Sequence, residues 1–276
     1  MDINRRNAIT KIIGFTGAAA GTSLISTPIM AAVNADGDYQ LELGEKLQYV
    51  KIDPIQTAKL AYETPGGCMR QVFHAVIQML ANSGSVDAAK FATIPTALAA
   101  YGGGGVLGQG TICGNCNATG MLLNILAIPN AEGLNGKING AIFRYYESTP
   151  LPYMDDEFVS AIGANPEDTA TKVVSNSVAN SFMCHSSISN WSDASGLGAK
   201  QKGERCRRLS ACMAHYIAVL LNRIVDGEDV DLAAMSVPEG SAGECVQCHS
   251  VDHMIGDAPS VSTGMDCTVC HTGHFN

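Results

Sequence analysis

Apolar side chains recur at helical spacing through most of the chain, and the alternation typical of strands is weak everywhere. The spacing predicts helices over residues 68–81, 86–101 (interrupted at Pro95), 117–128, 138–146, 167–180 and 203–225. Residues 36–62 and 186–202 are polar or rich in Ser and Gly, so we expect loops there. The pattern predicts a mainly α fold, in which a helical body precedes a C-terminal segment low in regular structure.

The first 35 residues differ from the body and have the features of an export signal. Arg5 and Arg6 stand in a polar stretch, a mildly apolar stretch follows from 12 to 32, and Val33-Asn34-Ala35 offers a small-residue cleavage site. We therefore predict a twin-arginine signal peptide over residues 1–35, which directs the protein to the periplasm and is removed there. Its glycines make it a poor membrane span, so no stable membrane insertion is expected after cleavage.

Two five-residue motifs near the C-terminus carry the most specific chemistry. They read Cys245-Val246-Gln247-Cys248-His249 and Cys267-Thr268-Val269-Cys270-His271. Each is a C-x-x-C-H motif, in which two thiols form thioethers with the vinyl groups of a haem and the histidine binds its iron. We predict two haem c groups on residues 239–276, preceded by a helical, cysteine-rich domain over residues 36–238 that holds an iron–sulfur cluster.

A zinc ribbon is the competing interpretation of the same four cysteines, because two C-x-x-C pairs can hold one Zn²⁺. A ribbon does not require histidine after both pairs. Histidine makes up only 7 of the 276 residues, so its presence at both positions by chance is improbable. The motifs therefore favour haem.

The histidines of the C-terminal segment divide into two roles. His249 and His271 are the proximal haem-iron ligands. His253 and His274 are the candidate distal ligands, but each lies too close in sequence to a proximal histidine to reach the far side of the same haem. Each could reach the neighbouring haem, or a haem of a second subunit. If both irons have two histidine ligands, no coordination position is open for a substrate.

Three further histidines lie near cysteines in the sequence: His74, His185 and His215. Their positions place them with a cysteine site in the body, and their alternative interpretation is as ordinary hydrogen-bonded histidines.

Six cysteines outside the haem motifs leave three interpretations open: Cys68, Cys113, Cys116, Cys184, Cys206 and Cys212. They could form disulfides, as exported proteins commonly do, or four of them could bind an iron–sulfur cluster. Cys113 and Cys116 could also form a redox-active dithiol, although the βαβ context of a thioredoxin motif is missing. The export route favours the cluster, because twin-arginine export moves folded proteins and haem c is attached only afterwards. A Gly-rich loop at 102–110 lacks the P-loop lysine and instead could bring backbone amides close to cluster sulfurs.

The charge of the chain limits its partners. The formal net charge is −9, and loss of residues 1–35 removes three basic and one acidic residue, which makes it −11. Nucleic-acid binding is therefore not expected, and a redox protein of basic or mixed charge is the expected partner.

The arrangement of cysteines resembles that of split-Soret cytochrome c, a family of dihaem proteins of sulfate-reducing bacteria. The resemblance rests on the paired C-terminal motifs, on Cys68, on the Gly-rich loop that leads into Cys113-Gly114, and on Cys184 and Cys206. The body also resembles a family of small redox-active proteins with four spaced cysteines, the second in a Cys-Gly-Ala element. This chain has Asn115 in place of that Ala, and Cys116 and Cys212 are additional.

The resemblance implies a homodimer with the haems near the interface and histidine ligation that can cross between subunits. It also implies a cluster, expected to be [2Fe–2S], in the helical body. Carried over by position, the ligands would be Cys68, Cys113, Cys184 and Cys206, with Cys116 and Cys212 as alternates.

Two functions follow from these features. The first is a periplasmic carrier that relays single electrons between redox partners, which makes the protein an electron carrier rather than an enzyme. The alternative is a small periplasmic reductase that acts on a sulfur or nitrogen oxyanion at an open haem or cluster site. The sequence shows no acid–base constellation for such an enzyme, and the net negative charge would steer anions away. A zinc-bound, disulfide-linked binding module is a third, weaker hypothesis.

Overall fold

The computed structural model describes residue 42, residues 44–236 and, beyond them, residues 245, 247–250, 252–261, 265, 267–269 and 271. The predicted signal peptide (1–35), the predicted domain boundary at 238/239, and two predicted site residues, Cys270 and His274, lie outside the described residues.

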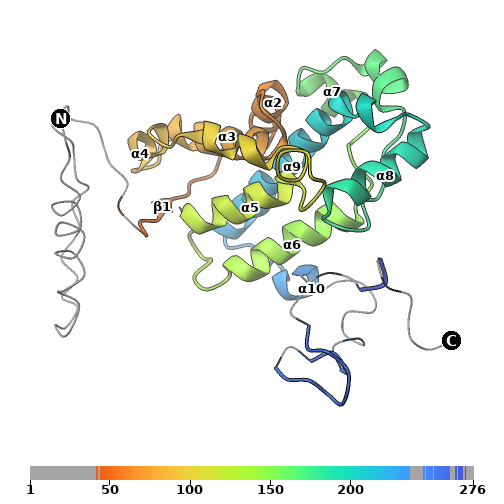
Figure 1. Ribbon diagram of the computed structural model, residues 1–276. Coiled ribbons are helices and arrows are strands. Elements are labelled where there is room, and N and C mark those ends of the chain that lie inside the picture. Colours follow the sequence, from red (N-terminus) through yellow and green to blue (C-terminus); the bar gives the residue numbers. More distant parts are fainter. Residues whose placement is uncertain are drawn as a thin grey trace, which may run out of the picture.

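The described body is built almost wholly from helices, which confirms the mainly α prediction (Figure 1). Its α-helices are α2 (Pro54–Glu63), α3 (Cys68–Ala81), α4 (Ala88–Ala92), α5 (Gly114–Ile125), α6 (Asn135–Ser148), α7 (Asp156–Ala161), α8 (Cys184–Ser195), α9 (Gly203–Val225) and α10 (Leu232–Ser236). Short 3-10 helices cover Thr96–Gly102, Pro166–Asp168, Ala199–Gln201 and Cys267–Val269, and Thr169–Val173 is a π-helical turn. The short strands β1 (Leu47–Gln48) and β2 (Leu126–Ala127) pair in parallel.

Helix α9 is the central element of the core and packs against α2 and α3. Its inner face carries Ala211, Ala214 and Ala218, and the facing helix α2 carries Ala58 and Ala61, all fully buried. Small side chains at helical spacing let two helices approach closely. Alanines of the Ala-rich chain therefore form the contact between α9 and α2. None of the helices that the structure describes combines the length and hydrophobicity needed to cross a bilayer.

One predicted boundary near the start of the body was wrong, and a second prediction there was confirmed. The loop expected over 36–62 contains helix α2 from Pro54 onward. Asp53 caps it by accepting a hydrogen bond from the Gln56 amide at 2.9 Å, and a proline at the first helical position is a standard start signal. The helical stretch expected over 86–101 is the short α4 followed by a 3-10 helix, and it is interrupted at Pro95 as predicted.

The region from 167 to 202 differs most from prediction. The helix expected over 167–180 ends after its π-helical turn, and Val174 has a φ of 60°. The loop expected over 186–202 contains helix α8. Trp191 explains both differences, because it is fully buried and its indole N–H donates to the Val173 carbonyl at 3.0 Å. Burial of this one large side chain outweighs the low helix propensity of the Ser-rich segment.

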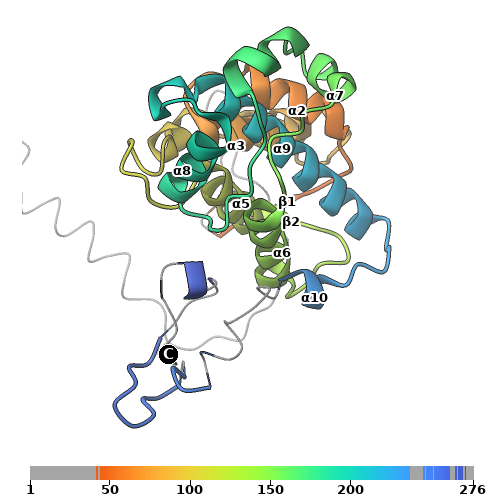
Figure 2. The ribbon, with the colours of Figure 1, turned by 90° about the vertical axis from the view of Figure 1, so that its right-hand side faces the viewer.

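The described parts of the C-terminal segment lie at one end of the body, beyond α6 and α10 (Figures 1 and 2). Met265 packs against the hydrophobic core of the body, and Thr268 lines a cavity whose other walls are α6, α8, α9 and α10. The described parts of the segment are low in regular structure, as predicted.

Arg208 is the buried charged residue on which the packing of α9 depends. Its side chain is about 1% exposed, its Nε donates to Glu204 at 2.8 Å and its Nη2 donates to the Asn165 carbonyl at 2.9 Å. We expect Arg208→Ala to lower the free energy of unfolding by about 3–5 kcal/mol, because it leaves Glu204 without its cation in a poorly hydrated place. Urea denaturation would measure this.

The matched control is Arg223→Ala, because Arg223 on the same helix pairs with Glu228 in an exposed position. An exposed pair contributes about 1 kcal/mol or less. Equal effects of the two substitutions would show that the Arg208 network is not structural.

Candidate metal centre

Four cysteines from four different helices surround one cavity of about 640 Å³: Cys68, Cys113, Cys184 and Cys206. Each stands at the N-terminal end of its helix. Cys68 is the first residue of α3, Cys184 is the first residue of α8, Cys113 caps α5, and Cys206 lies in the first turn of α9. The N-terminal end of a helix carries a partial positive charge of roughly half a unit, which favours thiolates. Four such ends meeting at one cavity make a site suited to a negatively charged group.

The sequence around Cys68 explains how these helices come so close together. Any side chain at Gly114 would place its Cβ 2.6 Å from the Cys68 sulfur, so only glycine permits this approach. The amides of Gly104 and Gly114 both donate hydrogen bonds to that sulfur. Gly104 belongs to the Gly-rich loop, which therefore supplies one backbone amide to a cysteine sulfur, as the sequence suggested.

Three of the thiols contact one another in a row. Cys113 interacts with both Cys68 and Cys184, and contact with Cys184, the largest cause, helps to raise the pKa of Cys113 to about 12. Interaction with Cys113 and then burial raise the pKa of Cys68, whereas contact with Cys113 lowers the pKa of Cys184. One thiolate therefore makes the next harder to form. All four sulfurs can be thiolates together only if a metal cation displaces the protons.

A buried arginine beside the cavity supports a negative occupant. Arg205 is 2% exposed, and within the described residues no carboxylate lies at ion-pair distance from it. Its Nη2 donates to the Ser187 hydroxyl at 2.9 Å, while its Nε is buried without a hydrogen-bond partner among the described residues. Burial raises the pKa of Cys206, and the adjacent Arg205 charge opposes that rise. A buried cation is costly unless an anion neutralises it, and thiolates bound to iron would do so.

The donor set therefore fits an iron–sulfur cluster. No group of three or more His, Cys, Asp or Glu side chains in the described parts of the chain is close enough to share one metal ion. A two-iron cluster does not require such a group, because each iron takes only two of the four protein ligands. No pair among the nine described cysteines is joined as a disulfide.

The two alternate cysteines lie apart from the lining of the cavity. Cys116 is fully buried on α5, one turn into the helix from Cys113. Cys212 is fully buried on α9 and accepts a hydrogen bond from the Tyr153 amide at 3.3 Å. Neither lines the cavity. Both are packed in the core, where a buried cysteine behaves as a small apolar side chain.

The three histidines expected beside the cysteines have other partners, and none lines the cavity. His74 Nδ1 lies 2.8 Å from the Thr96 hydroxyl, and His185 Nδ1 lies 3.1 Å from the Gly110 carbonyl. His215 packs edge-on against Phe158. The alternative interpretation, ordinary packed or hydrogen-bonded histidines, holds for all three.

Sequence reasoning missed Arg205 and Tyr146. Tyr146 on α6 is fully buried and lines the cavity, and its hydroxyl has no hydrogen-bond partner among the described residues. No local pattern marks Tyr146. Arg205 directly precedes Cys206 in a predicted helix, which was the only available signal.

In each C-x-x-C-H motif, the described backbone closes a helical turn between the first cysteine and the histidine. The His249 amide donates to the Cys245 carbonyl at 2.8 Å, and the His271 amide donates to the Cys267 carbonyl at 2.9 Å. Residues at i, i+3 and i+4 of a helical turn share one face, so in the first motif the turn brings Cys245, Cys248 and His249 to the same side. His249 Nδ1 lies 2.9 Å from the Pro259 carbonyl. With the proton on Nδ1, the tautomer assigned from this contact makes Nε2 the nitrogen that would bind a haem iron.

The described distal candidate, His253, is exposed, and it stands beside Met254, which is 61% exposed. Such exposure is what a ligand for a haem of another motif or another subunit requires, and the assignment stays a prediction.

Comparison with known proteins identifies one curated relative and one solved structure. No family model matches the chain. Split-Soret cytochrome c from Desulfovibrio desulfuricans is 28% identical over 287 residues, which cover 99% of this chain and 96% of that protein. A solved structure of split-Soret cytochrome c from Desulfovibrio desulfuricans, described as having a novel iron centre, matches with a TM-score of 0.64 and 29% identity. The match covers 81% of this chain and 89% of that one. These findings confirm the resemblance to split-Soret cytochrome c and the mainly α fold.

Proposed function

We propose that this chain, which resembles split-Soret cytochrome c along almost its whole length, is a periplasmic electron-transfer protein with two haem c groups and one iron–sulfur cluster. The likeness to a cytochrome c supports haem-based electron transfer. The two C-x-x-C-H turns supply the attachment thiols, Cys245 and Cys248 in the first motif and Cys267 and Cys270 in the second. His249 and His271 would be the proximal iron ligands.

One observation carries the proposal of a cluster: four cysteines at four helix N-termini surround one cavity that also contains an unneutralised buried arginine. Cys68, Cys113, Cys184 and Cys206 would hold the cluster, which we take to be [2Fe–2S], and Cys116 and Cys212 would not. A bound cluster supplies one-electron chemistry. The helix ends, the Gly104 amide and Arg205 would stabilise its negative charge and so favour its reduced form.

The distal haem ligands and the quaternary structure belong to the same proposal. His253 and His274 would each bind the iron of a neighbouring haem, within the subunit or across a homodimer interface close to the haems. Export by the twin-arginine route would then deliver a body already folded around its cluster, with haem attachment following in the periplasm. The net charge favours redox partners of basic or mixed charge.

One observation favours the alternative of a reductase. Four cationic residues line the cysteine cavity, Lys200, Lys202, Arg205 and Arg207, with Glu63 as an acidic neighbour. The cavity thus has the opposite sign to the whole chain, so the net charge does not exclude anions there. Nitrite or sulfite that altered the optical spectrum of the reduced protein would favour the reductase over the carrier.

The spectroscopic test of the carrier follows from the ligand set. Two histidine ligands on each iron should give six-coordinate, low-spin haems in both oxidation states, and carbon monoxide should leave the reduced spectrum unchanged. Electron paramagnetic resonance of the oxidised protein and optical titration with carbon monoxide would measure this. A high-spin haem that binds carbon monoxide readily would contradict the carrier and leave an open site for catalysis.

A further inference from the structure

Three buried hydrogen-bond donors at the cysteine cavity have no acceptor. They are the Tyr146 hydroxyl, the Asn115 side-chain nitrogen and the Arg205 Nε, and none has a hydrogen-bond partner among the described residues. All three residues line the cavity of about 640 Å³, and all three are almost completely shielded from solvent. A buried donor without an acceptor is unfavourable, so three of them at one cavity indicate an occupant that carries acceptors.

The Asn115 side chain is oriented by one hydrogen bond. Its Oδ1 accepts from the Ser210 hydroxyl at 3.0 Å, and the amide N–H groups, assigned from this contact, are left as donors. Asn115 is the second residue of α5 and follows Cys113 by two positions. It stands where the Cys-Gly-Ala element of the resembling redox-active proteins has Ala, so this donor is an addition in this chain.

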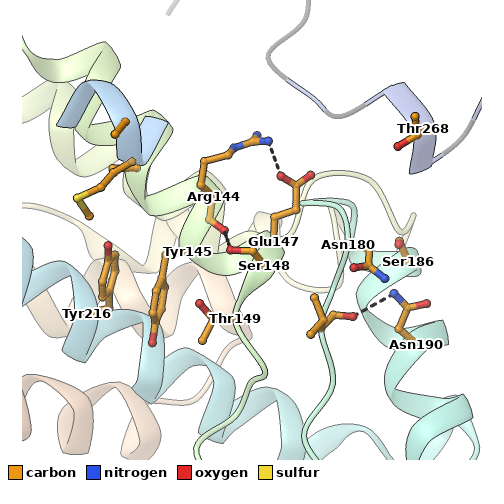
Figure 3. Close-up of a pocket in the computed structure, with 14 residues that line it drawn as sticks. Arg144, Tyr145, Glu147, Ser148, Thr149, Asn180, Ser186, Asn190, Tyr216 and Thr268 are labelled. Carbon is orange, nitrogen blue, oxygen red and sulfur yellow. Dashed lines mark hydrogen bonds and ion pairs between the residues drawn. The ribbon is translucent and has the colours of Figure 1, made fainter. Parts of the chain in front are cut away.

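Tyr146 reaches the cavity from α6. Burial, and then the nearby Cys113 and Cys116, raise the pKa of Tyr146 well above its usual value, so the hydroxyl keeps its proton and is available as a donor. The preceding residue, Tyr145, lines a separate cavity, where its ring stacks on Tyr216 (Figure 3). Of these three tyrosines, only Tyr146 lines the cysteine cavity.

Anionic sulfur is the acceptor that the cavity would offer to these donors. A thiol is a weak acceptor, and Cys113 already interacts with both Cys68 and Cys184. Hydrogen bonds to an ionised acceptor are about twice as strong as those between neutral groups. An iron–sulfur cluster would bring its sulfides and four cysteine thiolates into reach of the donors.

We propose that Tyr146 and Asn115, together with Arg205, donate hydrogen bonds to the sulfurs of the cluster, and that Tyr146 and Asn115 are positioning residues that raise its reduction potential. Hydrogen bonds to the sulfurs stabilise the more negative, reduced form, and both donors keep their protons when the electron arrives. The proposal rests on the proposed function, since it requires a cluster on the four cysteines.

The reduction potential of the cluster tests both residues. Tyr146→Phe removes only the hydroxyl, and Asn115→Ala removes the amide while the Ser210 hydroxyl keeps the Cys206 carbonyl, 3.0 Å away, as a partner. In each variant the reduced form should become less favourable by about tenfold, which lowers the potential by about 59 mV for one electron. Tyr216→Phe removes a hydroxyl outside the cysteine cavity and should leave the potential unchanged. Redox titration followed by electron paramagnetic resonance would measure the potentials.

Stability without the cluster separates a donor to the cluster from a donor that holds the fold together. Tyr146→Phe would be made in full-length Cys184→Ala, which is expected to lack the cluster, and compared with Cys184→Ala alone. The midpoint of urea denaturation should be unchanged or higher, because the substitution removes a buried hydroxyl that has no partner. A lower midpoint would overturn the assignment of Tyr146, since the hydroxyl would then have a partner within the protein.

Acid-labile sulfide distinguishes failure of this proposal from failure of the proposed function. If wild-type protein contains sulfide and the potential is unchanged in both Tyr146→Phe and Asn115→Ala, the donor assignment is wrong and the cluster stands. If wild-type protein contains no sulfide, the cluster itself is refuted, and with it the acceptors that the donors require.

Discussion

Cys184→Ala is expected to remove the non-haem iron from the protein and to leave both haems attached. Cys184 is 5% exposed, starts helix α8 and contacts Cys113 across the cysteine cavity. Loss of a residue that only supports a metal ligand already lowers metal affinity by roughly 10–100-fold, so loss of a ligand should cost at least tenfold. Iron analysis corrected for haem iron, on protein purified without oxygen, would measure the loss.

Two matched controls come from the chain itself. Cys116→Ala and Cys212→Ala remove thiols that are as buried as Cys184 but do not line the cavity. Both variants should retain the non-haem iron of the wild-type protein. If Cys116→Ala or Cys212→Ala lost the iron and Cys184→Ala kept it, the set of four ligands proposed above would be wrong.

Cys245→Ala/Cys248→Ala is expected to halve the haem content, from two haems per chain to one. The thioether bonds of each haem are formed only by the two cysteines of its own motif, and the turn at Cys267 is closed by a hydrogen bond within its own motif, from the His271 amide to the Cys267 carbonyl. The pyridine haemochrome assay per mole of protein would measure the change, and far-ultraviolet circular dichroism should show an unchanged helical body.

Replacement of the neighbouring exposed residue Asp252 by Ala is a suitable control, because Asp252 lies outside both motifs. It should keep both haems. A wild-type protein with four bound cysteines, zinc and no haemochrome would support the zinc ribbon instead.

The haem motifs could be predicted from sequence because their chemistry is local. A single turn from Cys245 to His249 places the thiols and the imidazole together, and it needs no information from the rest of the fold. The cysteine cavity is different, because it joins residues from 68 to 206 and depends on where helices begin. The start of α3 could be predicted, since Gly66 and Gly67 precede Cys68.

The start of α8 could not be predicted from the sequence. For this reason the sequence did not show that all four cysteines stand at the N-terminal ends of helices. Ser-rich residues after Cys184 favour a loop by propensity, but burial of Trp191 and its bond to Val173 make them a helix. Arg205 was equally hidden, because a helical pattern does not tell whether an arginine faces water or a cavity. The start of α8 and the orientation of Arg205 both depend on tertiary packing, which a local sequence pattern does not show.

The ratio of iron to acid-labile sulfide tests the central claim most directly. Protein purified without oxygen should contain about four irons per chain, two of them in haem and two accompanied by two sulfides, as a [2Fe–2S] cluster requires. The Cys184→Ala variant, purified in the same way, should contain no acid-labile sulfide and should keep only its two haem irons. Two irons per chain with no sulfide would contradict the account, because the four cysteines would then surround a cavity that holds no cluster.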